Sequence, residues 1–406
     1  MKAHERLLRY VSFDTQSKED SNQTPSTEKQ FKLGQELKKE LLELGLKKVV
    51  LDESCYLYGF LPATKGMKNK KALGLIAHMD TAPSFSGENV KPQIIEGYNG
   101  KDVLLKGSGE LLTVSDFPDL KEHVGKTLIT TDGTTLLGAD DKAGVAEIFT
   151  AIEEIILEKS PHGDIWVGIT PDEEIGMGAS KFNYDYFKAD FAYTLDGDYE
   201  GELAYENFNA ASAVFKVCGK NVHPGSAKNI MVNAASIASE IQSMMPRFDV
   251  PECTEGREGF IMLCEISGDV NEAKLEYILR DHDMSKFEDR KKLCINICEY
   301  INNKYTEGTV ELIIEDSYLN MLKVMEQHMD IVELGKEAIK SIGLEFKCSP
   351  IRGGTDGATL TNNGLPCPNL GTGGYAFHGP YEHITVEGMK NSVEIAKYII
   401  SNMPTA

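Results

Sequence analysis

The stretch Ala72-Leu-Gly-Leu-Ile-Ala-His-Met-Asp80 sets the expectation for the fold, because a short apolar run leads directly into polar residues. Residues 72–77 are apolar, which predicts a buried β-strand. His78 and Asp80 follow at once, and the two-residue period of a strand points both side chains to the same side. Open α/β sheets place their functional sites where such strands end, so we expect a site here.

Two later apolar runs have the same form. Residues 164–170 predict a second buried strand, and the acidic residues 172–174 follow it. Residues 191–195 predict a third, which ends at Asp196. The carboxylates therefore gather where strands end, which strengthens the expectation of a polar site at one edge of the sheet.

Helical patterns alternate with these strands. Residues 143–158 (AGVAEIFTAIEEIILE) predict a strong helix, entered from an Asp140-Asp141 pair that can cap its first turn. Residues 26–45 predict an amphipathic helix that ends at Gly45. Strands that alternate with helices favour an α/β fold in which helices cover both faces of the sheet.

The pattern changes from about residue 211. The order βαββαβ that follows is that of the ferredoxin-like unit, and polar motifs lie on both sides of it. We therefore expect a catalytic domain, residues 1–210 and 317–406, that is interrupted by an inserted domain, residues 211–316. The elements expected from here on are strands at 211–219, 259–268, 273–281 and 309–317, helices at 228–245, 286–304 and 322–342, and glycine-rich turns flanking short strands at 352–380.

Composition excludes several classes of protein. The 406 residues include 42 Lys and Arg against 63 Asp and Glu, a net charge of −21, which would repel nucleic acid. The eight cysteines form no Cys-x-x-Cys pair and are too sparse for a disulfide scaffold. Residues 1–15 lack the apolar core of a signal peptide, and no run approaches the ~20 apolar residues of a membrane span. We therefore expect a cytoplasmic protein with no nucleic-acid or membrane partner.

Five residues at the ends of these elements form a candidate metal site. Imidazole and carboxylate ligands without thiolate suit a catalytic zinc, or cobalt or manganese in the same geometry. Two ions fit such a set well, because one carboxylate can bridge them while each takes one histidine and one further acid. The five candidates are His78, Asp140, Glu174, Asp196 and His378.

Two more carboxylates have predicted roles beside the metals. Asp80 can accept the second imidazole N–H of His78 and so hold its tautomer. Consecutive carboxylates such as Glu173 and Glu174 repel each other, and the conflict is resolved if Glu174 binds metal while Glu173 activates the attacking water. Two alternatives give these residues no chemical role. Glu173 and Glu174 can belong to a solvated run of surface charges, and Asp80 can simply begin a loop.

The chain resembles the peptidase T family of bacterial tripeptide aminopeptidases, in the di-zinc aminoacylase and carboxypeptidase superfamily, over essentially its whole length. The strings that carry the resemblance are GLIAHMDTAP, TDGTTLLGADDKAGVAEI, TPDEEIGMGA, YTLDGD, HPGSAKNIMVNA, RGGTDGATLTNNGLPCPNLGTGG and FHG. The resemblance implies a di-zinc exopeptidase catalytic domain, with a mixed central sheet covered by helices, and a ferredoxin-like lid at 211–316. It also implies two zinc ions per chain, with cobalt or manganese able to substitute, and tripeptides as substrates.

The resemblance also implies a role for each matching position. Asp140 matches the bridging ligand; His78 and Asp196 complete one metal's set, and Glu174 and His378 the other's. Glu173 matches the general base and Asp80 the residue that orients His78. His223 matches a residue that holds the scissile carbonyl oxygen in relatives. The positions that fall where relatives contact the substrate's carboxy-terminal side are Asn233, Arg280, Arg352, Gly353 and Gly354.

Other readings stay open. An N-acyl amino acid deacylase or a carboxypeptidase of the same superfamily differs from the aminopeptidase only in its specificity residues. A peptide- or metal-binding protein without turnover is disfavoured, because binding alone needs no spare carboxylate such as Glu173. The oligomeric state is open, a homodimer included. The remaining histidines, His123 among them, are expected to be structural or exposed, and His383 is left unassigned.

Overall fold

The computed structural model describes the whole chain, Met1–Ala406, which divides into two compact units. The larger unit comprises Met1–Tyr205, Lys323–Ser349 and Thr355–Ala406, and the smaller comprises Glu206–Leu322 and Pro350–Gly354. No helix combines the length and the apolar composition that crossing a bilayer requires.

The smaller unit extends beyond the residues 211–316 expected from the sequence, and residues 350–354 belong to it rather than to the larger unit. The cause is a set of contacts between residues 350–354 and distant segments of the smaller unit. Ile351 pairs with Asn207 through the backbone, and the Arg352 side chain donates to backbone carbonyls of the loop at residues 254–258. A sequence pattern does not reveal these contacts, because they join segments far apart in the chain.

The larger unit is built on a seven-stranded mixed sheet in the order β1-β2-β8-β3-β9-β15-β10. Strands β8, β3, β9 and β15 run parallel to one another. Strand β2 pairs antiparallel with β8 and with β1, and β10 pairs antiparallel with β15. A second sheet has the order β16-β17-β7-β4. The elements of this unit are α1 (Ala3–Tyr10), α2 (Gln30–Glu43), β1 (Lys47–Leu51), β2 (Leu57–Leu61), β3 (Leu73–His78), β4 (Gln93–Ile95), β5 (Val103–Leu104), β6 (Leu111–Leu112), η1 (Pro118–His123), β7 (Leu128–Thr130), α3 (Ala139–Glu158), β8 (Ile165–Thr170), η2 (Glu173–Ile175), β9 (Phe191–Leu195), β10 (Leu203–Ala204), α7 (Met329–Ser341), α8 (Asp356–Asn362), β15 (Asn369–Leu370), β16 (Gly374–Tyr375), β17 (His383–Thr385) and α9 (Val386–Ser401), with α6 (Leu322–Met325) at the boundary.

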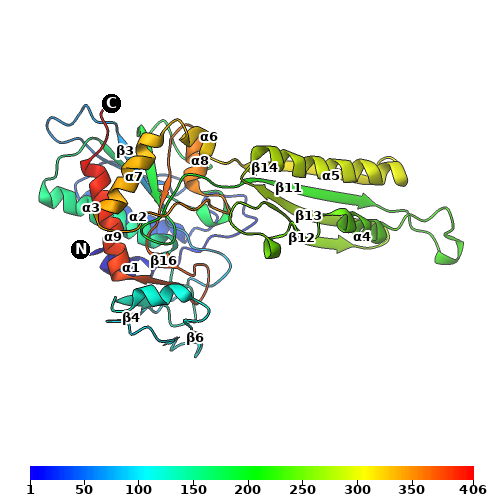
Figure 1. Ribbon diagram of the computed structural model, residues 1–406, viewed down its shortest axis with the longest axis horizontal. Helices are drawn as coiled ribbons and strands as arrows, with labels where there is room; N and C mark the ends of the chain where they lie inside the picture. The colour runs from blue at the N-terminus through cyan, green and yellow to red at the C-terminus, as the bar shows by residue number, and fades with distance from the viewer. The chain divides into compact units, whose positions relative to one another are not determined.

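Both faces of the seven-stranded sheet are covered, as the apolar strands predict. On one face α3 packs on β3 and β9, with α1 and α9 beside it (Figure 1). On the other face Ile76, Trp166 and Ala192 pack into a cluster rich in aromatic side chains, which includes Phe182 and Phe187. The alternation of side chains along each strand divides the core between the two faces.

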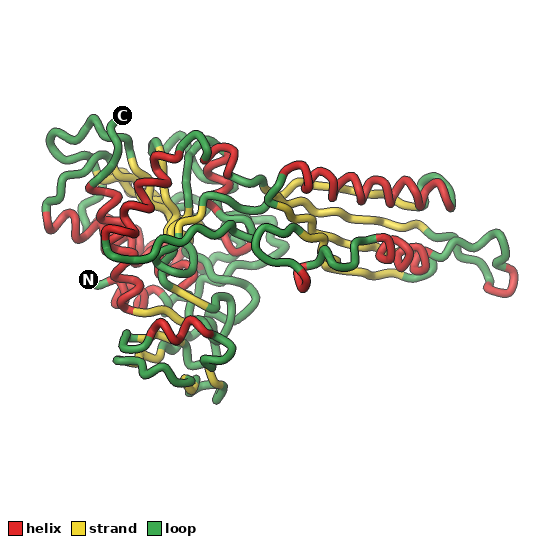
Figure 2. The backbone as a smooth tube through the Cα atoms, viewed as in Figure 1, coloured by secondary structure: helices red, strands yellow, loops and turns green.

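The smaller unit is a four-stranded antiparallel sheet in the order β12-β13-β11-β14, the strand order of a ferredoxin-like fold. Figure 2 shows its two long helices alongside the strands. Side chains of β13 alternate between buried and partly exposed positions, and Leu275 and Leu279 join the helices' apolar residues in one core. The elements are β11 (Asn209–Cys218), η3 (Pro224–Ser226), α4 (Ala234–Met244), η4 (Pro251–Cys253), β12 (Phe260–Gly268), β13 (Glu272–Asp281), α5 (Met284–Lys304) and β14 (Val310–Tyr318).

Two expected segments differ from the structure. The helix predicted over 322–342 is broken into α6 and α7. Met325 and Met329 keep the i, i+4 spacing of a helix across the break, so the apolar pattern does not reveal it. The turns predicted over 352–380 contain the helix α8, which Thr355 caps by accepting a hydrogen bond from the Ala358 N–H at 3.1 Å.

Candidate metal centre

Three neighbouring parallel strands bring the candidate residues to one edge of the sheet. Strand β3 lies between β8 and β9, and His78 at its end pairs with Thr170 at the end of β8. The loop with Glu173 and Glu174 follows β8, and Asp196 follows β9. This is the carboxyl edge of the parallel strands, where the sequence predicts the site.

Asp140, just before the helical part of α3, lies between two imidazoles. Its Oδ1 is 2.9 Å from His78 Nε2 and its Oδ2 is 3.1 Å from His378 Nε2. His378 Nε2 also lies 2.9 Å from Glu174 Oε2. One carboxylate thus faces both histidines with different oxygens, which is the arrangement a bridging ligand needs.

Asp196 completes a second group. Ligand atoms of His78, Asp141 and Asp196 lie within 4.8 Å of one another. The oxygens of Asp141, however, accept the backbone N–H groups of His78 at 3.1 Å and Gly144 at 3.1 Å. Asp141 therefore holds the backbone at His78 and caps the helical part of α3. Of the two aspartates, Asp196 is the one available to bind a metal ion.

Asp80 connects the histidine to the acidic loop. His78 Nδ1 lies 3.3 Å from Asp80 Oδ1 and 3.2 Å from the Asp80 carbonyl oxygen, both acceptors. The two carboxylate oxygens also accept the backbone N–H groups of Glu173 at 3.0 Å and Glu174 at 3.2 Å. Asp80 thus holds the His78 tautomer and the position of both glutamates.

Burial and crowding shift the pKa values of the cluster's carboxylates. Burial raises the pKa of Glu174 to about 8 and that of Asp196 to about 7, and raises the pKa of Glu173 well above its usual value. The carboxylates of Asp140 and Glu174, which accept hydrogen bonds from His378, raise the pKa of His378 to about 11. Carboxylates crowded in this way favour a cation among them.

The residues present fit a zinc-type metal pair. Because Asp80 accepts from His78 Nδ1, the Nε2 lone pair of a neutral ring faces the Asp140 carboxylate at 2.9 Å, and these two acceptors need a cation or a second ring proton between them. Glu174 Oε1 is buried without a hydrogen-bond partner, so it is free to bind one. Imidazole nitrogen and carboxylate oxygen are ligands that zinc accepts.

The sequence did not indicate Glu382, which positions the backbone around Asp140. Its buried carboxylate accepts the backbone N–H groups of Leu137 at 2.7 Å, Gly138 at 2.8 Å and Asp140 at 3.0 Å. Glu382 lies four positions after His378 and belongs to no apolar pattern, so only its contacts identify it.

The predicted substrate residues belong to the smaller unit and have different surroundings. His223 is exposed, and its Nδ1 accepts the Gly225 N–H; Asn233 caps α4 by accepting from the Ser236 N–H. Arg280 donates one hydrogen bond to the Arg352 carbonyl, and its buried Nε has no partner. A Cβ at Gly353 would meet nothing within 4 Å, so packing does not require glycine there.

A model of peptidase family M20/M25/M40 matches residues 131–402. The chain belongs to this family. The chain is 53% identical to Peptidase T of Caldanaerobacter subterraneus subsp. tengcongensis over 401 aligned residues. The alignment covers 98% of each protein. Two solved structures are each 25% identical and cover 98% of this chain and 97% of the other: aminopeptidase PepT from Bacillus cereus (TM-score 0.78) and a tripeptidase from Staphylococcus aureus (TM-score 0.77). The resemblance and the fold class predicted from the sequence are confirmed.

Proposed function

We propose that this M20 peptidase is a metallo-aminopeptidase that removes the N-terminal residue from free tripeptides. The observation that carries the proposal is Asp140, which faces two imidazoles with its two oxygens while Glu173 lies beside Glu174. Full-length similarity to Peptidase T and to a tripeptidase supports the substrate class.

In this proposal His78 and Asp196 would hold one zinc ion, Glu174 and His378 would hold the other, and Asp140 would be a ligand of both. When bound, the ions polarise the scissile carbonyl and lower the pKa of the attacking water, and cobalt or manganese can replace zinc. Glu173 takes the proton of that water and passes it to the leaving amine.

The substrate contacts that the resemblance implies, His223, Asn233, Arg280, Arg352 and Gly353, all belong to the smaller unit. Of the two arginines left open by the sequence, Arg352 already donates to three carbonyl groups and the Thr254 hydroxyl. Arg280 has a buried Nε without a partner, so we assign the substrate's carboxylate to Arg280. His223 keeps its proposed contact with the scissile carbonyl oxygen. A homodimer and a cytoplasmic location remain predictions.

A tripeptide of three different residues tests the proposal, with metal analysis of the same sample. The metal-loaded protein is expected to release the N-terminal amino acid and leave the C-terminal dipeptide, and chelation is expected to abolish release. A carboxypeptidase would instead release the C-terminal amino acid. No release by protein with its metal restored would overturn the proposal.

A further inference from the structure

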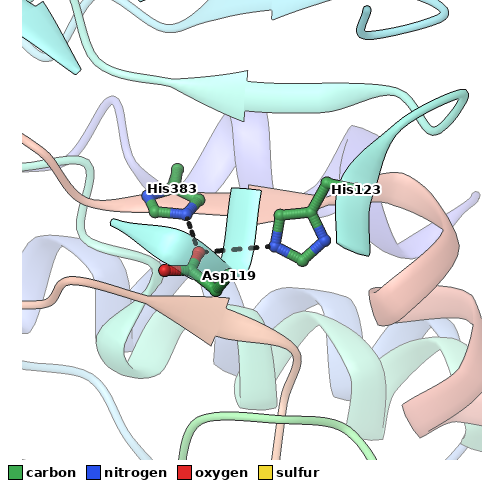
Figure 3. A group of neighbouring side chains, drawn as sticks. All are labelled: Asp119, His123 and His383. Atoms are coloured by element: carbon green, nitrogen blue, oxygen red, sulfur yellow. Dashed lines mark hydrogen bonds and ion pairs between the residues drawn. The ribbon is translucent and has the colours of Figure 1, made fainter. Parts of the chain in front are cut away.

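A second group of histidines and one carboxylate lies in the larger unit, outside the candidate metal centre. Asp119 and His123 belong to η1, and His383 begins β17 in the small sheet (Figure 3). Both histidines are buried, and the Asp119 side chain is 26% exposed. We call these three residues the His-Asp-His cluster.

The hydrogen bonds of His383 define which of its nitrogens faces Asp119. Its Nδ1 lies 2.8 Å from the Tyr381 carbonyl oxygen, which can only accept, so Nδ1 carries a proton. In a neutral ring Nε2 then presents a lone pair, and it lies 2.7 Å from Asp119 Oδ2. Two acceptors at this distance require a cation or a second proton. A ligating histidine typically donates its other N–H to a carbonyl in this way.

His123 provides the independent observation. It is 1% exposed, and neither of its ring nitrogens has a hydrogen-bond partner. Its Nε2 points toward Asp119 Oδ2 but lies 3.7 Å away, too far for a hydrogen bond. A buried imidazole without partners is costly, and a bound ion would satisfy it.

The spacing of the three atoms suits a tetrahedral ion. Zinc with bonds of about 2.0–2.1 Å places neighbouring ligand atoms about 3.3 Å apart. The distances from Asp119 Oδ2, 2.7 Å to His383 and 3.7 Å to His123, lie on either side of that value. All three ligand atoms lie within 4.8 Å of one another. Tyr375 packs against both imidazoles, at 4.9 and 5.6 Å between ring centroids, and holds them in place.

We propose that Asp119, His123 and His383 bind a third zinc-type ion, separate from the catalytic pair. Two imidazole nitrogens and one carboxylate oxygen suit zinc better than magnesium or calcium, which prefer oxygen ligands. The exposed side of Asp119 leaves a fourth position to water. The ion joins η1 to β17 and so stabilises the strand that follows Glu382.

The zinc content of His123→Phe tests the proposal, because phenylalanine fills the buried space without a ligand atom. Apo protein is loaded with Zn²⁺, weakly held metal is removed by gel filtration with a mild chelator, and zinc per chain is measured. Wild-type protein is expected to hold one equivalent more than His123→Phe. Equal zinc content would overturn the proposal and leave only the contact between His383 and Asp119.

Two further variants make the result specific. Asp119→Asn changes a partly exposed side chain at nearly constant volume, and it is expected to lose the same single equivalent even if His123→Phe folds poorly. His282→Phe is the matched control, because His282 is also buried without hydrogen-bond partners and lies 3.8 Å from a single carboxylate oxygen of Glu206. It is expected to keep the wild-type zinc content; loss of zinc there would overturn the assignment. The comparison does not depend on tripeptide turnover.

Discussion

The candidate metal centre and the His-Asp-His cluster use the same local device. In each, one imidazole donates Nδ1–H to an acceptor, Asp80 for His78 and the Tyr381 carbonyl for His383. The Nε2 atom of each then faces a carboxylate, at 2.9 Å from Asp140 and 2.7 Å from Asp119. Both arrangements prepare a histidine to bind a cation.

The two clusters differ in what surrounds the histidines. The candidate metal centre has a carboxylate shared by two imidazoles and a further glutamate, Glu173, that metal binding does not require. The His-Asp-His cluster has one carboxylate and no spare base among its members. Binding an ion and activating water are therefore separable properties, and the spare carboxylate marks the catalytic site.

The largest effect is expected from Asp140→Ala. Because this carboxylate faces both imidazoles, its loss should remove both catalytic zinc ions and abolish tripeptide turnover, while the third ion remains. His78→Ala and His378→Ala should each retain more metal, since each histidine serves one ion. Elemental analysis checks this, and three zinc ions per chain in Asp140→Ala would refute the shared ligand.

Glu173→Gln should follow in size. The amide keeps the volume of the side chain but cannot accept the proton of the attacking water, so kcat should fall by roughly 10²–10⁴-fold. Zinc content should equal that of the wild type. Near-normal kcat in metal-replete protein would remove Glu173 from its role.

Glu382→Gln should have an intermediate effect. The amide places an N–H₂ group where a carboxylate oxygen now accepts backbone N–H groups of the Asp140 loop. Loss of such support typically lowers metal affinity by about 10–100-fold. Competition with a chelator should show weaker binding of the catalytic pair, whereas kcat at saturating zinc should change little. Unchanged zinc affinity would show that the loop holds its position without Glu382.

The smallest effect on catalysis is expected from His123→Phe. The His-Asp-His cluster contains no group with a role in the reaction, so kcat for tripeptides should stay within about twofold of wild type when one zinc equivalent is lost. Added zinc should raise the thermal unfolding temperature of the variant by less than it raises that of the wild type. A large loss of kcat would show that the two clusters are coupled.

The sequence predicts the buried strands and the helix after Asp140 because each is a continuous local pattern that ends in polar residues. It fails for the edge strands β1 and β10 of the seven-stranded sheet and for the helices α1 and α9, which no apolar run identified. Helix α9 begins after Thr385, whose hydroxyl accepts the Gly388 N–H at 2.9 Å, so a capping residue was present as a signal.

The functional sites, like the elements, can be predicted only where a continuous local pattern leads to them. His78, Glu174 and Asp196 follow predicted strands, so their proximity can be expected from the sheet alone. Asp119 in η1 and His383 in β17 are 264 positions apart and follow no predicted element, so no local pattern places them together. The sequence around a histidine in a short turn does not show whether that histidine binds a metal ion or only packs in the core.

The most direct test of the proposed function compares kcat/KM for a free tripeptide, its N-acetyl form and its C-terminal amide. A cluster of carboxylates should bind a protonated amino terminus, and Arg280 should bind a free carboxylate. The account predicts efficient cleavage of the free tripeptide and a sharp loss for both blocked forms. Equal values for all three would contradict it, and a preference for the N-acetyl form would establish the deacylase alternative.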